Sequence, residues 1–85
     1  MRIVYSPRFA RRYKKLPRSV KLAAEHNEQL FRKNPFDASL NTHKLKGRLR
    51  GFWSFSIGRE YRIVFEFAEG NTVYFHDVGN HRVYQ

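Results

Sequence analysis

The last third of the chain contains three aromatic-rich runs with the alternating pattern of β-strands, separated by short turns. We expect strands at about residues 52–58, 60–67 and 72–78. The connections at residues 58–60 and 69–71 contain glycine and are short enough for hairpins. Consecutive hairpins predict an antiparallel meander, which strongly limits the folds that this chain can adopt.

The second of these runs carries an arginine in its middle. Strand alternation places Arg62, Val64 and Glu66 on one face and the aromatic side chains of this run on the other. An arginine in mid-strand is costly unless it meets water, an anion or a partner. We therefore expect Arg62 on a face that is not covered by helices. Pairing with Glu60 or Glu66 across the sheet is the structural alternative.

The first half of the chain predicts a short strand followed by two helices. Residues 2–5 alternate as a strand does, and Ser6-Pro7 then has the residue types of a helix N-cap and first helical position. Pro17 ends this helix and can begin the next, which spans residues 18–33 and stops at Asn34-Pro35. The buried stripe of the second helix comprises Val20, Ala23, Ala24, Asn27, Leu30 and Phe31.

These elements predict one domain over residues 1–85, because a chain of this length supports a single small core. The expected fold class is α+β in the order β-α-α-β-β-β. A helical hairpin would pack on one face of an antiparallel sheet. The other face would be partly open and would carry Arg62.

The charge is strongly positive and uneven. The net charge is +10; residues 1–50 hold 14 lysines and arginines against 3 acidic residues, and residues 51–85 hold 3 against 4. This asymmetry favours a polyanionic partner, with nucleic acid or the ribosome first, although an acidic protein or a merely solvated surface would also fit. If residues 44–50 were extended, four alternating cations would line one side of the segment or guard a strand edge: Lys44, Lys46, Arg48 and Arg50. Gly47 and Gly51 suggest bends or a bulge there.

Several function classes find no support in the sequence. Cysteine is absent, which excludes disulfides and thiolate metal sites and fits a cytoplasmic protein. No apolar stretch approaches the ~20 residues of a membrane span, and residues 1–5 do not begin a signal peptide. No set of histidines and carboxylates has metal-binding spacing, and no serine–histidine–aspartate set or glycine-rich phosphate loop stands out. We therefore expect no metal and no cofactor.

The order and spacing of several short motifs resemble the RelE/ParE superfamily of toxins from type II toxin–antitoxin systems. The resemblance covers essentially the whole chain, and its motifs are Leu45-Lys46-Gly47, Gly51-Phe52-Trp53-Ser54, Tyr61-Arg62-Ile63-Val64-Phe65 and the segment from Val78 to Tyr84, with Phe9 to Pro17 before them. It implies a microbial-RNase-type fold, metal-independent chemistry and inhibition by an antitoxin. One branch of the superfamily cleaves messenger RNA in the ribosomal A site, whereas the ParE branch poisons DNA gyrase.

For the ribonuclease branch, the resemblance implies a site made of Arg62, His81, Tyr84 and His43. Cleavage without metal needs a cation for the phosphate and two proton-transfer groups, and histidine suits both proton tasks. We assign Arg62 as the phosphate clamp and the two histidines as the proton-transfer pair, in either order. Tyr84 would contact the nucleotide, and Lys44, Lys46, Arg48 and Arg50 would hold backbone phosphates.

The sequence also departs from the residue pattern of one well-known type of toxin in this superfamily. Purely structural roles for the candidate site residues remain open as well. Lysines found on the strand in that type are replaced here by Ser54 and Ser56, so the histidine-bearing subgroup is the better match. His81 could be a solvated tail residue, His43 an inert loop histidine and Tyr84 a core cap. His76 and Asp77 alternate across the last strand and receive no role.

Three hypotheses follow: a ribosome-dependent mRNA interferase, an inhibitor of DNA gyrase without nuclease activity, and a non-catalytic nucleic-acid or ribosome-binding module. The histidines favour the first, because a gyrase inhibitor has no evident need for paired imidazoles. The expected partners are the ribosome with its mRNA and an antitoxin. The antitoxin would be acidic or amphipathic and could form a hetero-oligomer with the toxin.

Overall fold

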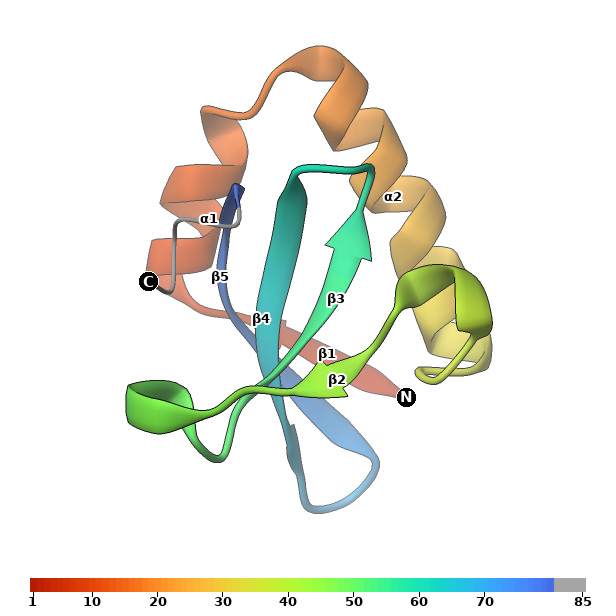
Figure 1. Ribbon diagram of the computed structural model, residues 1–85, viewed down its shortest axis with the longest axis vertical. Helices are drawn as coiled ribbons and strands as arrows, with labels where there is room; N and C mark the ends of the chain where they lie inside the picture. The colour runs from red at the N-terminus through yellow and green to blue at the C-terminus, as the bar shows by residue number, and fades with distance from the viewer. Residues whose placement is uncertain (81–85) are drawn as a thin grey trace.

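The computed structural model describes residues 1–80, which form an α+β fold of two helices and a five-stranded sheet (Figure 1). The helices are α1 (Pro7–Lys14) and α2 (Arg18–Lys33). The strands are β1 (Arg2–Tyr5), β2 (His43–Lys44), β3 (Trp53–Ile57), β4 (Tyr61–Ala68) and β5 (Thr72–Asn80). Two short 3-10 turns, η1 (Ala38–Leu40) and η2 (Gly47–Leu49), flank β2. The expected fold class is confirmed.

The sheet has the strand order β1-β5-β4-β3-β2. β3, β4 and β5 form the predicted antiparallel meander. β1, however, pairs in parallel with β5, with Arg2 opposite Thr72 and Tyr5 opposite Phe75, so the sheet is mixed rather than wholly antiparallel. No turn connects these two strands directly, so their relative direction is not set by a local signal.

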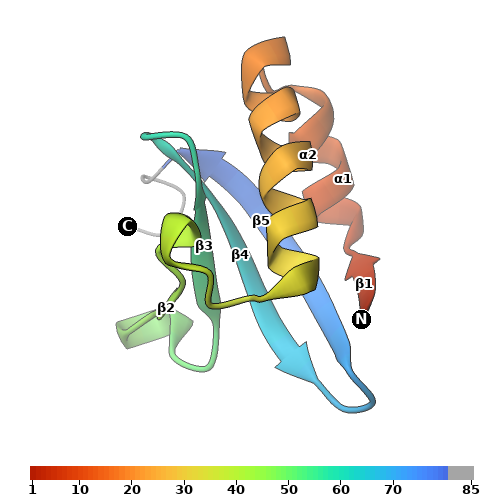
Figure 2. The same ribbon diagram turned by 90° about the vertical axis from the view of Figure 1, so that its right-hand side faces the viewer.

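Both helices lie on one side of the sheet, and β2 with the segment after it curves toward the other side (Figure 2). The core between helices and sheet is built from phenylalanine rings. Phe31 of α2 is fully buried, with its ring centroid 4.7 Å from that of Phe55 and 4.9 Å from that of Phe65. Burying one such ring stabilises the fold by about 2–3 kcal/mol. Within residues 1–80, neither helix is both long and apolar enough to span a bilayer.

The helix boundaries follow the predicted signals. Ser6 is the N-cap of α1 and its Oγ accepts a 3.0 Å hydrogen bond from the Phe9 N–H, with Pro7 in the first helical position. In α2, the predicted apolar stripe includes one polar residue, Asn27. Its side-chain amide donates a 2.7 Å hydrogen bond to the Ser56 carbonyl. Asn27 therefore ties α2 to β3.

A β-bulge interrupts the pairing of β4 with β5. Val64 is opposite Asp77, but the next pair is Phe65 with Phe75, so His76 is the extra residue. The bulge lets both Phe75 and Val78 enter the core even though they are three positions apart. The faces of β5 on either side of His76 are consequently set by the bulge and not by simple alternation.

Asp77 turns toward α1 as a result. Its carboxylate lies 3.3 Å from Arg8 Nε and 3.4 Å from Arg12 Nη1, and it accepts a 2.8 Å hydrogen bond from the Val78 N–H. The residue is only 9% exposed, so these partners compensate a charge that is largely removed from water. The bulge overturns the expected alternation of His76 and Asp77, because Asp77 pairs with Val64 on the side of the sheet where His76 meets Glu66. The Asp77 carboxylate nevertheless reaches α1 and has a structural task.

Candidate functional site on the helix-free face

The sheet face opposite α1 and α2, called the helix-free face below, carries Arg62. This residue lies in the middle of β4, in register with Ser56 on β3 and Gly79 on β5, and it is half-buried. Within residues 1–80 its guanidinium forms no ion pair, and its side chain donates a single, long hydrogen bond of 3.4 Å from Nη1 to the Tyr61 carbonyl. The alternative of pairing with Glu60 or Glu66 is thus not realised there, and most guanidinium donors remain available for an anion.

His43 belongs to the same face. It pairs with Ser54 on β3, which in turn pairs with Val64 on β4, and directly paired residues point to the same side of a sheet. From the strand spacing and rise, the Cα atoms of His43 and Arg62 are roughly 12 Å apart. Long side chains at that separation can contact the same phosphodiester.

The tautomer of the neutral His43 ring can be inferred from its contact. Nδ1 lies 2.9 Å from the Asn41 carbonyl, and the imidazole is exposed. A carbonyl oxygen only accepts, so Nδ1 carries the hydrogen, and in the neutral ring Nε2 then holds the free lone pair. This tautomer is suited to accept a proton at Nε2.

A second histidine on this face was missed by the sequence analysis. His76 Nε2 lies 2.7 Å from Glu66 Oε1, and their side chains are 35% and 42% exposed. The rings of His76 and Phe52 also pack edge-to-face, with their centroids 5.0 Å apart. The signal was present in the hairpin register, because Glu66 pairs with Tyr74 and is therefore the diagonal neighbour of His76.

The basic segment does not form the expected one-sided row. Its four cations are exposed, but η2 replaces an extended strand, and Gly47 and Gly51 adopt φ angles of 67° and 101°. The segment is not extended, so its four cations do not share one side, and the predicted bends at both glycines are confirmed. Lys44 pairs with Trp53 and so lies on the opposite face from His43, with its Nζ 5.5 Å from the centre of the Trp53 ring.

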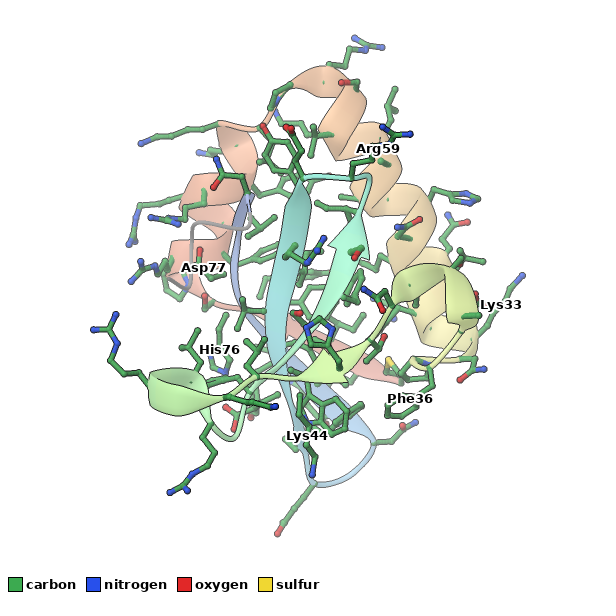
Figure 3. The ribbon with its side chains drawn as sticks, in the orientation of Figure 1. Lys33, Phe36, Lys44, Arg59, His76 and Asp77 are labelled. Atoms are coloured by element: carbon green, nitrogen blue, oxygen red, sulfur yellow. The ribbon has the colours of Figure 1, made fainter. Side chains whose placement is uncertain are left out.

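In Figure 3, Lys44 lies near Phe36 at the lower end of the sheet, and His76 and Asp77 project from β5. Two of the predicted site residues, His81 and Tyr84, fall outside the described residues. The structure therefore brings Arg62 and His43 to one face and separates Lys44 from them. In the described part of the chain, no three histidines or carboxylates gather in a way that could hold a metal ion.

A groove between α1 and α2 is a hollow on the opposite side of the molecule. It has a volume of about 900 Å³, and Tyr5 lines it together with Glu28 and Arg32. The Tyr5 hydroxyl donates a 2.7 Å hydrogen bond to Glu28, and Arg32 lies 3.4 Å from the same carboxylate oxygen. Burial raises the pKa of the Tyr5 phenol, and Glu28 raises it further. Tyr5, Glu28 and Arg32 are thus partners of one another. This cluster therefore does not offer a free cation that could bind a phosphate in the groove.

Two helices on one face of a mixed sheet, with a basic and histidine-bearing surface elsewhere, define the class of small RelE-like toxins. Residues 3–83 match the family described as "ParE toxin of type II toxin-antitoxin system, parDE". The chain belongs to this family. No curated protein sequence shows significant similarity to it.

Solved structures share the fold at low sequence identity. A YoeB/ParE toxin from Agrobacterium tumefaciens is 20% identical with a TM-score of 0.79, and the match covers 95% of this chain and 99% of that one. YafQ from an E. coli strain is 17% identical with a TM-score of 0.79, covering 96% of both chains. In the RelB–RelE antitoxin–toxin complex from Methanococcus jannaschii, the matching chain is 21% identical with a TM-score of 0.72, covering 93% of this chain and 91% of that one.

Proposed function

We propose that this toxin is a ribosome-dependent endoribonuclease that cleaves messenger RNA without a metal ion. The observation that carries the proposal is the position of Arg62. Its guanidinium sits in the middle of the helix-free face and forms no ion pair within residues 1–80, while the exposed imidazole of His43 lies on the same face. A cation and a proton-accepting imidazole on one face are two of the three groups that metal-free cleavage of a phosphodiester needs.

The residues have separate tasks in this proposal. Arg62 binds the phosphate and stabilises the charge that develops on it, and His43 and His81 transfer the two protons. Tyr84 contacts the nucleotide by stacking or hydrogen bonding. Backbone phosphates further along the RNA are held by Lys46, Arg48 and Arg50, which carry no sequence information. Lys44 is less suited to this task because it lies over Trp53 on the other face.

The proposed partners are the ribosome with its mRNA and a cognate antitoxin. Because translation takes place in the cytoplasm, we propose that the protein acts there. The net charge of +10 supports an anionic partner. The fold match to a toxin chain solved with its antitoxin supports a toxin–antitoxin hetero-oligomer for this chain as well. An acidic or amphipathic antitoxin segment would complement the basic half of the sequence.

Induced expression in bacteria tests the proposal, with cleavage of translated mRNA mapped by primer extension. We expect Arg62→Ala and His81→Ala to fold normally and to lose both growth arrest and cleavage. Arg59→Ala is the matched control, because Arg59 is exposed in the β3–β4 turn. Full toxicity of both site variants would overturn the assignment. We also expect little cutting of naked RNA, because a site with so few groups depends on the ribosome to align the 2′-hydroxyl.

The family match favours one second candidate, since its description refers to the ParE toxin of a parDE system. In that case the protein would inhibit DNA gyrase and leave mRNA intact. Growth arrest without mapped cleavage, together with loss of gyrase supercoiling activity in the presence of purified toxin, would favour this candidate over the nuclease.

A further inference from the structure

We infer that His76, held by Glu66, protonates the leaving 5′-oxygen and so takes this proton transfer from His81, while His43 remains the base. The inference rests on the proposed nuclease function and assigns a chemical role to a pair that the sequence motifs do not include. Its starting point is the 2.7 Å contact between His76 Nε2 and Glu66 Oε1 on the helix-free face. A proton-transfer group that is oriented by a carboxylate is a recurring arrangement in enzymes.

The register of the sheet places His76 across from His43. A row of paired residues runs from His43 on β2 through Ser54 and Val64 to Asp77 on β5, and His76 directly precedes Asp77. Three strand spacings separate the ends of the row, so the Cα atoms of His43 and His76 are roughly 14 Å apart. Two imidazole side chains that extend over the strands between them would leave a gap about the size of a phosphodiester group.

The contacts of His76 show that its ring reaches over β4 and does not turn outward from the sheet. It meets Glu66 of β4, and it also packs edge-to-face against Phe52, which directly precedes β3. Arg62 lies two residues from Val64 along β4, on the same face. Ser54 and Val64 in the middle of the row are buried, at 0% and 4% exposed, so a phosphodiester would lie above the side chains that cover them. It would have the guanidinium on one side and an imidazole on each flank.

The hydrogen bond to Glu66 defines which nitrogen of His76 can exchange a proton. The ionised carboxylate accepts from Nε2–H, so the exchangeable proton of the imidazolium is the one on Nδ1. In the proposed step, His43 Nε2 removes the proton of the 2′-hydroxyl while O2′ attacks phosphorus. The bond between phosphorus and O5′ breaks, and Nδ1 of His76 gives its proton to O5′. The products are a 2′,3′-cyclic phosphate and a free 5′-hydroxyl.

A merely structural role would leave catalysis unchanged. Both side chains of the pair are about a third exposed or more, and exposed ion pairs contribute little to stability. Changes at either residue are therefore expected to preserve the fold. Glutamine at position 76 can still hydrogen-bond Glu66 but cannot transfer a proton, which separates the chemistry from the contact.

The test measures single-turnover cleavage on programmed ribosomes with saturating toxin and two mRNAs. One is ordinary, and the other has sulfur in place of the bridging 5′-oxygen at the mapped cleavage site. A thiolate leaves without being protonated, so the second mRNA does not need a general acid. We expect His76→Gln to cut the ordinary mRNA about 10²-fold to 10⁴-fold more slowly, and to cut the sulfur-substituted mRNA at nearly the wild-type rate.

The controls distinguish a failure at His76 from a failure of the nuclease proposal itself. His43→Ala should cleave both mRNAs slowly. Glu66→Gln should slow cleavage of the ordinary mRNA as His76→Gln does, but by a smaller factor. His26→Gln should behave as wild type, because His26 is an exposed residue of α2. Wild-type rates for His76→Gln on ordinary mRNA, or an equal loss on both mRNAs, would overturn the role of His76 while leaving the nuclease proposal intact. Absence of cleavage by the wild-type protein would overturn both.

Discussion

Ser6 Oγ donates a 2.9 Å hydrogen bond to the main-chain carbonyl of His76, and the same oxygen accepts the N–H of Phe9. One hydroxyl thus caps α1 and also holds the bulge of β5. The Ser6 N–H adds a 3.0 Å hydrogen bond to the Phe75 carbonyl. The first turn of α1 is therefore fastened to the strand segment that presents His76 on the helix-free face.

The two bonds of Ser6 can be separated by substitution. We expect Ser6→Ala to lower the free energy of unfolding by about 1–2 kcal/mol, because it removes the helix cap and leaves a backbone carbonyl without its donor. Ser6→Asp retains an N-cap acceptor but cannot donate to the His76 carbonyl, and its stability should fall between those of wild type and Ser6→Ala. Urea denaturation measures both. Unchanged stability of Ser6→Ala would contradict the double role.

Asp77 should be more important for stability than the exposed ion pairs of the chain. Asp77→Ala removes the partner of Arg8 and Arg12 and leaves the Val78 N–H unsatisfied, which we expect to cost about 1–3 kcal/mol. Asp77→Asn keeps an acceptor for Val78 and should recover part of that stability. Thermal unfolding followed by circular dichroism distinguishes the variants. Equal stability of the alanine variant and wild type would show that these interactions contribute nothing.

We expect the Asp37 carboxylate to make the stability of the chain depend on pH. The hydroxyl of Ser39 and then its backbone N–H hydrogen-bond the carboxylate and hold the pKa of Asp37 below the usual 3.8. The resulting stabilisation is complete well above pH 3.8 and is lost as the pH falls through the lowered pKa. Asp37→Asn should therefore unfold at a lower temperature than wild type near neutral pH. The two melting temperatures should converge in acid, and a gap that persists at low pH would contradict this account.

The basic segment at residues 44–50 predicts that the affinity for the ribosome depends on salt concentration. Removing the charges of Lys46, Arg48 and Arg50 should weaken binding at every mRNA sequence, and should reduce the slope of log affinity against log salt by about 1 for each phosphate that is no longer neutralised. Lys44→Gln should have a smaller effect, because Lys44 lies over Trp53. Lys33→Gln at the end of α2 is the matched control. Sedimentation with ribosomes over a salt series measures the slope, and an unchanged slope for the triple variant would rule out a role for these cations.

Local signals in the sequence determined the elements and much of the candidate site. The Ser6-Pro7 pair marked the start of α1, and alternation along β4 placed Arg62 away from the helices, because side-chain direction in a strand depends only on position along it. The glycines at 47 and 51 indicated bends that are present. The order of the short motifs along the chain was also sufficient to indicate the toxin family.

Pairing between distant segments was decided only by the tertiary structure. The parallel approach of β1 to β5, the bulge at His76 and the contact of His76 with Glu66 depend on the register between strands. Register is fixed by hydrogen bonds and core packing across the sheet, and a bulge of one residue changes which side chains face the core. For that reason the pattern of the strands predicted Arg62 on the helix-free face, while only the folded sheet decided which residues of β5 face the core after His76.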